Sequence, residues 1–130
     1  GVAAPLTLTL GATGSTGGTL SGVIGGGLDV MNLATAVGGT YTLSNANSYA
    51  GITTVASGTT LRLGTGSSGG DGSINSTSGV TNNGTLTFNP FGSIASSYPI
   101  SGSGAIVKNG AGSQSMGGQN SFSGTTTVNA

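Results

Sequence analysis

Histidine, cysteine, glutamate and tryptophan are absent from this chain of 130 residues, and the charged side chains are limited to Asp29, Arg62, Asp71 and Lys108. Without histidine or cysteine there is no base for a Ser-His-Asp triad or a Cys-His dyad, and no imidazole or thiolate for a zinc site. Two cations cannot neutralise a row of phosphates, which makes nucleic acid a poor partner. No apolar run approaches the roughly 20 residues of a membrane-spanning helix, so we expect no membrane insertion.

The two acidic residues give little support to an enzyme. Asp29 and Asp71 could form a carboxylate pair of the kind that glycoside hydrolases use, but they lie in different motifs. Asp71 stands in Gly69-Gly70-Asp71-Gly72, which has the composition of a turn. One carboxylate is also too little for the roughly six to eight oxygen ligands of calcium. We therefore expect no enzyme activity, no catalytic or metal-binding residues and no cofactor.

Glycine, threonine, serine and asparagine dominate the composition, with 28, 20, 19 and 10 copies. Leucine, isoleucine, valine and phenylalanine total 27, close to the compositional border of disorder, but the net charge is 0 and lysine, glutamate and proline are scarce. The apolar residues fall in short, partly β-branched runs separated by Gly, Asn and Ser. This arrangement indicates an ordered all-β protein, because such runs are typical of strands that end in turns.

Alternation of apolar and polar residues predicts strands at four places: Leu6–Leu10, Thr40–Leu43, Thr60–Leu63 and Thr85–Phe88. Shorter candidates are Gly22–Ile24, Leu28–Met31, Ile52–Val55, Ala105–Lys108 and Thr125–Val128. Gly- and Asn-rich turn signals bound nearly every one of them. Many short strands with glycine-rich corners are typical of a sandwich, a barrel or a solenoid.

Internal repetition favours the solenoid. When residues 39–55 are placed over residues 112–128, seven of the 17 positions are identical, among them Asn47 over Asn120, and Tyr49 falls on Phe122. Repeats too small to bury a core alone are the mark of stacked rungs. We predict a parallel β-solenoid (β-helix) of about five or six rungs, with Asn47 and Asn120 at matching corners. Residues 1–130 would form a single domain of two imperfect repeats, about 1–57 and 58–130.

Four segments carry a likeness to a known family: residues 61–64, 80–89, 100–112 and 120–130. Together they resemble the autotransporter-associated β-strand repeat of Gram-negative passenger regions and related surface proteins, whereas residues 36–44 depart from it. The resemblance implies a right-handed parallel β-helix that is exported and exposed, extracellularly, at the bacterial outer cell surface. It implies no catalytic residues. The role that we expect is structural.

The two ends of the chain suggest assembly. Joining Ala130 to Gly1 restores the motif that stops at Val128, and a solenoid end is an open strand edge with no evident cap, Pro5 aside. Head-to-tail stacking of subunits would make an extracellular fibre, with the N-terminal strand 2–10 completing the C-terminal rung of a neighbour. The predicted subunit interface consists of Val2, Leu6, Leu8, Leu10, Thr126 and Val128. The alternative is a fragment of a passenger stalk, whose partners are neighbouring repeats of a longer chain.

An adhesin is the main functional competitor. The six aromatic residues of the chain could form a carbohydrate-binding strip for a glycan or a host surface, and we expect such a patch near Phe88–Tyr98. The pairing of Tyr49 with Phe122 in the repeats favours packing instead. Four Thr-x-Thr pairs are little more than the about three expected at random for this threonine content, so they give no support to ice binding.

Overall fold

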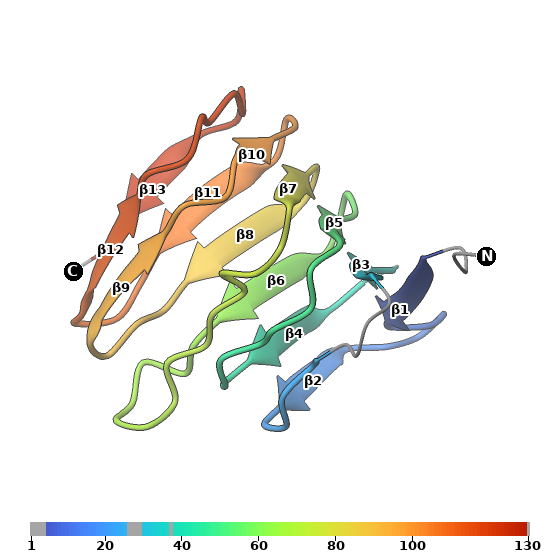
Figure 1. The fold of residues 1–130 in the computed structure, drawn as a ribbon, viewed down its shortest axis with the longest axis horizontal. Coiled ribbons are helices and arrows are strands. Elements are labelled where there is room, and N and C mark those ends of the chain that lie inside the picture. The colour runs from blue at the N-terminus through green and yellow to red at the C-terminus, as the bar shows by residue number, and fades with distance from the viewer. Residues whose placement is uncertain (1–4, 26–29, 37, 130) are drawn as a thin grey trace.

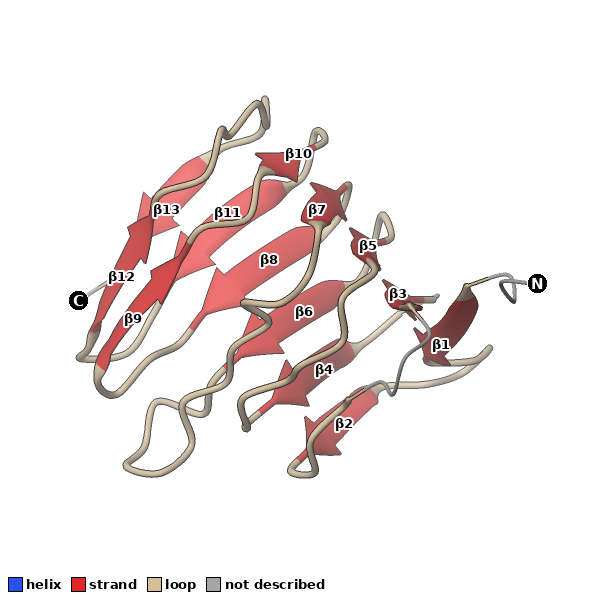
Figure 2. Cartoon of the chain, viewed as in Figure 1, coloured by secondary structure: helices blue, strands red, loops and turns tan. Residues whose placement is uncertain are grey.

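The computed structural model describes residues 5–25, 30–36 and 38–129. Within these ranges the chain forms thirteen short strands joined by loops, without any helix (Figure 2). A helix of the length and apolarity that a membrane crossing needs is accordingly not found in the described ranges. Figure 1 shows the strands as a stack in which the chain passes from the N-terminal end to the C-terminal end, one layer at a time.

A six-stranded sheet forms one face of the stack. We call it the second face, because each turn of the chain crosses it after the five-stranded sheet. Every strand in it pairs in parallel with its neighbours. In spatial order its strands are β2 (Gly17–Leu20), β4 (Thr40–Leu43), β6 (Thr60–Leu63), β8 (Thr85–Phe88), β11 (Ala105–Lys108) and β13 (Thr126–Val128).

A five-stranded parallel sheet forms the first face, and a third face closes each turn of the chain. The first face contains β1 (Leu6–Leu10), β3 (Met31–Thr35), β5 (Ile52–Val55), β7 (Gly79–Asn82) and β10 (Ile100–Ser101). The third face contains the parallel pair β9 (Ser93–Ser96) and β12 (Ser113–Met116). Among the described residues of its earlier rungs this face is irregular, with a single parallel bridge between Ala46 and Ser73.

Each turn of the chain therefore makes one rung of a parallel β-solenoid, and the predicted fold class is confirmed. The second face is crossed six times, in agreement with the prediction of about five or six rungs. The rungs differ in length: Leu6 pairs with Met31, 25 residues on, whereas Thr85 pairs with Ala105 and Ile106 with Thr126, each 20 residues on. Extra residues are accommodated in loops, so the register of the interior is kept.

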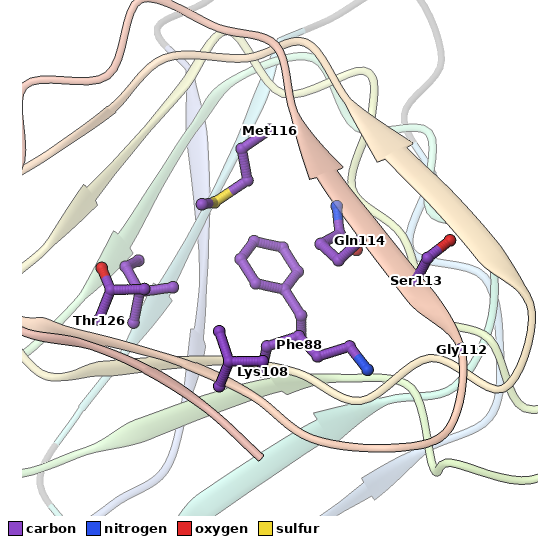
Figure 3. Close-up of a pocket in the computed structure, with 9 residues that line it drawn as sticks. Phe88, Lys108, Gly112, Ser113, Gln114, Met116 and Thr126 are labelled. Atoms are coloured by element: carbon purple, nitrogen blue, oxygen red, sulfur yellow. The ribbon is translucent and has the colours of Figure 1, made fainter. Parts of the chain in front are cut away.

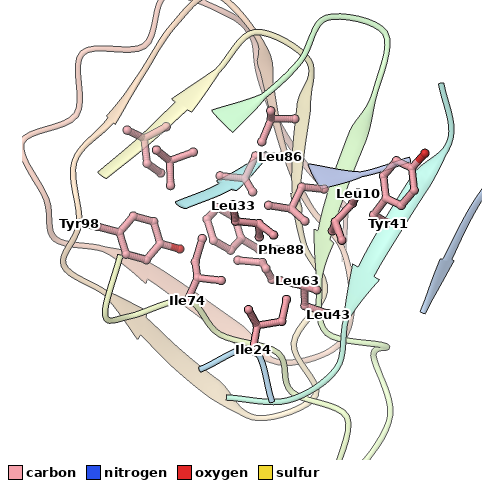
Figure 4. Packing of buried hydrophobic residues seen from close by; sticks show 14 of the residues in the cluster. Leu10, Ile24, Leu33, Tyr41, Leu43, Leu63, Ile74, Leu86, Phe88 and Tyr98 are labelled. Carbon is pink, nitrogen blue, oxygen red and sulfur yellow. The ribbon is translucent and has the colours of Figure 1, made fainter. Parts of the chain in front are cut away.

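The core is a set of apolar ladders that run along the axis, because in-register parallel strands place like positions above one another. On the second face one ladder joins Leu61, Leu86 and Ile106, each no more than 1% exposed. A second joins Leu43, Leu63 and Phe88 (Figure 4). The core also contains buried threonines. The hydroxyl groups of Thr53 and Thr77 form a hydrogen bond, with 2.9 Å between their oxygen atoms.

Glycine is required where two rungs meet at a corner. Gly102 has a φ of +100°, and a Cβ there would lie against the backbone oxygen of Asn82 in the rung before. Gly112 and Gly124 sit equally close to the backbone of the preceding rung. The many glycines thus let the chain turn sharply while adjacent rungs stay within hydrogen-bonding distance.

The four strands predicted from alternation are all present with the predicted bounds. Three shorter candidates are also strands, at Ile52–Val55, Ala105–Lys108 and Thr126–Val128. Gly22–Ile24 is a loop, because on the early third face only isolated contacts link the rungs. The candidate Leu28–Met31 lies partly outside the described residues, and its end, Met31, begins β3.

Asn47 and Asn120 make the same contact at different corners. The Oδ1 atom of Asn47 accepts a hydrogen bond from the backbone N–H of Ile24 at 2.8 Å, and Oδ1 of Asn120 accepts one from that of Ile100 at 3.0 Å. Ile100 begins β10 on the first face, whereas Ile24 lies below Ser48 on the third face. The expected matching corners are therefore wrong, because an offset of 73 residues shifts the motif by one face.

Candidate functional site at the ends of the solenoid

The N-terminal end of the stack is an open edge with apolar side chains. In β1, Leu6 is 71% and Leu8 37% exposed, although the alternation of the strand points both toward the interior. Leu8 pairs with Leu33 and Leu10 with Thr35 in the next rung. Leu10 is only 7% exposed, so of the predicted interface residues in β1 it is the one that lies inside the core. Val2 lies outside the described residues.

Tyr41 fills the interior just above this edge. Its partner in the first rung is Gly18, which has no side chain, and a Cβ on Gly11 would collide with the Tyr41 hydroxyl. The Tyr41 ring therefore occupies the space that Gly11 leaves free. Its hydroxyl is buried without a hydrogen-bond partner in the described part of the chain.

The C-terminal end is hollow. The last strand, β13, covers the second face only, and β12 on the third face pairs on one side alone, with β9. Between them lies a cavity of about 350 Å³, with Phe88, Ile106 and Met116 among the residues that line it (Figure 3). Val128, at the rim, is 70% exposed, and Thr126 is exposed as well.

Two polar side chains also line the cavity, Lys108 and Gln114. Lys108 follows Ile106 by two residues in β11, so both face inward, and it stacks between Phe88 and Val128. The Lys108 Nζ atom donates a hydrogen bond to the Gly110 backbone oxygen at 2.6 Å. The Gln114 Nε2 atom donates to Ser96 Oγ at 3.2 Å and to the Ser115 backbone oxygen at 3.0 Å.

Sequence reasoning missed this cavity and its lysine. The signal was present, since strict alternation in Ala105–Lys108 places Lys108 on the same face as Ile106. The expectation of a solenoid end without an evident cap did not include this inward charge.

An asparagine ladder marks the corner between the second and third faces. Asn129 Nδ2 donates to Asn109 Oδ1 at 2.8 Å, and Asn89 Nδ2 donates to the Gly64 backbone oxygen at 3.4 Å. Each of these side chains links one rung to the rung before. The amide of Asn129 stands at the C-terminal step of the ladder.

The remaining charged residues in the described ranges serve the fold. Asp71 accepts backbone hydrogen bonds from Phe91 at 2.6 Å and Gly92 at 2.9 Å, and so fastens its loop to the corner above. Arg62 lies on the outer surface and donates from Nε to Thr42 Oγ1 at 3.0 Å. Asp29 lies outside the described residues.

The aromatic residues form no surface strip. Tyr41, Tyr49, Phe88 and Tyr98 are at most 5% exposed, and Phe122 packs partly buried against the core. Phe91 is the exception, with 51% exposure. Burial raises the pKa of Tyr98 to about 12 although Ser96 offers a hydrogen bond that lowers it, and burial raises the pKa of Tyr49 still further.

Two segments of the chain, residues 38–63 and 106–130, match the family model of the passenger-associated-transport-repeat. The match confirms the resemblance to autotransporter passenger repeats, and the second segment includes the strands at the C-terminal end. Repeats of this family are associated with secreted or outer-surface proteins of Gram-negative bacteria. No curated protein and no solved structure matches the chain.

Proposed function

We propose that this chain is a non-enzymatic structural segment of a surface-exposed passenger, a short rod that continues through further rungs of the same kind. The observation that carries the proposal is that, in the part of the chain that the structure describes, both ends of the stack have strands without a further partner: β1 and β2 at one end, β12 and β13 at the other. Parallel pairing with further rungs would satisfy their backbone groups and cover Leu6 and Val128. Six rungs add about 30 Å of length at a rise of about 4.8 Å per rung.

A tandem fusion tests this function. Two copies joined from Ala130 to Gly1 are expected to fold as one straight rod, so small-angle X-ray scattering should show about 30 Å more length at an unchanged cross-section. A matched control places a flexible Gly/Ser linker of about 15 residues at the junction, which uncouples the two copies. If the direct fusion scatters like this control, as two independent particles, the proposal is refuted.

Head-to-tail stacking of separate subunits into an extracellular fibre is the second candidate. The exposed apolar residues Leu6 and Val128 at opposite ends favour it. In such a stack β1, which opens the first face, would begin a new rung above the Ser121 region, since Ser121 already stacks on Ile100. Filaments in negative-stain micrographs of the isolated chain would support this candidate, and monodisperse particles at high concentration would contradict it.

A further inference from the structure

Lys108 interrupts an apolar ladder. The inward positions below it on the second face are Leu43, Leu63 and Phe88, all at most 3% exposed, and Val128 follows it. Every residue that precedes Lys108 in this ladder is apolar. It is also half-buried and belongs to the wall of the end cavity.

Burial of the Lys108 ammonium group becomes energetically unfavourable once the cavity is covered. Its contact with the Gly110 oxygen at 2.6 Å uses one of the three protons that an ammonium carries. A strand laid along β12 would close the cavity and remove the remaining protons from water. Burial of a charge is unfavourable unless a charged or strongly accepting partner is supplied.

We propose that Lys108 makes the C-terminal end selective for a parallel β-strand that brings a carboxylate into the cavity. The inference rests on the proposed function of this end as the seat of a further rung. The incoming strand pairs with β12, and its first inward side chain stacks on Gln114. An Asp or Glu there accepts a charge-assisted hydrogen bond from the Lys108 ammonium, which still has free protons.

Peptide binding tests the selectivity. The probes are the synthetic peptide Ser-Thr-Glu-Thr-Leu-Thr-Asn-Gly, which places Glu over Gln114 and Leu over Met116, and its twin with Gln in place of Glu. Amide shifts of residues 113–116, followed by nuclear magnetic resonance, report binding along β12. We expect the Glu peptide to bind at least about tenfold more tightly than the Gln peptide, which corresponds to about 1.4 kcal/mol. In Lys108→Met this preference should vanish.

Equal binding of the two peptides, no shift with either, or a preference that persists in Lys108→Met would overturn the proposal. The tandem fusion distinguishes a failure of this proposal from a failure of the proposed function. If the fusion forms one rod while the peptides show no preference, the stacking of rungs is supported and the selectivity of Lys108 is refuted.

Discussion

The interior ladders predict a large and local cost for removing one leucine. Leu86 is 0% exposed and stacks between Leu61 and Ile106, which are themselves at most 1% exposed. Truncation to alanine in a well-packed core costs about 2–5 kcal/mol, and the cost rises when the surroundings cannot collapse into the space. Backbone hydrogen bonds hold the rungs on both sides of Leu86 at a fixed spacing. We therefore expect Leu86→Ala to cost about 3–5 kcal/mol.

Equilibrium unfolding in urea, followed by far-UV circular dichroism, measures this cost. Ile52→Ala is the matched control, because Ile52 lies in a strand of the same stack but is 51% exposed. It should cost less than about 1 kcal/mol, since most of its side chain stays in water in the folded state. A cost of Leu86→Ala no larger than that of Ile52→Ala would show that the interior ladder is not the source of stability.

Three further predictions concern the tyrosines, the corners and the loop clamp. Burial holds the pKa of Tyr98 at about 12, above its unfolded value near 10, so the contribution of Tyr98 to stability is full below pH 10 and falls by about 1.4 kcal/mol per pH unit between pH 10 and 12, in addition to the loss from Tyr49; Tyr98→Phe should reduce the slope of stability against pH by this amount in urea titrations, and an unchanged slope would contradict it. Gly102→Ala should lower the melting temperature far more than Gly18→Ala, because only the first has positive φ and backbone contact with Asn82; equal shifts would count against the corner argument. Asp71→Ala should lower the free energy of unfolding by about 1–3 kcal/mol and speed hydrogen exchange at the Phe91 and Gly92 amides; unchanged exchange would mean that Asp71 does not hold this loop in place.

The sequence predicted the solenoid because its period-two runs are bounded by turn residues and its motifs recur. Leu6–Leu10 and Thr85–Phe88 show why this works, since each apolar residue of the alternation faces the core or its open edge. Ser93–Ser96 and Ser113–Met116 escaped prediction as strands because serine and glutamine carry little strand signal. Their pairing comes from the stacked register that the neighbouring faces impose.

The end cavity could be predicted only in part. Unpaired edges follow from any solenoid, and the exposure of Leu6 and Val128 agrees with that expectation. The position of Lys108 required the strand register, which alternation supplies, together with the rung that leaves the third face open at β12, which only the three-dimensional stack shows. The face shift between Asn47 and Asn120 was hidden for the same reason, because rung length varies along the chain.

Distances between spin labels show whether the chain is a single file of parallel rungs. The chain has no cysteine, so cysteines introduced in pairs can be labelled specifically. One pair replaces Thr19 and Val107 and the other replaces Thr19 and Thr127, all on the outer side of the second face. Pulsed electron paramagnetic resonance should place labels at 19 and 107 about 19 Å apart and labels at 19 and 127 about 24 Å apart, one rung of about 4.8 Å per step. A distance from 19 to 127 that is equal to or shorter than that from 19 to 107 would contradict the stack.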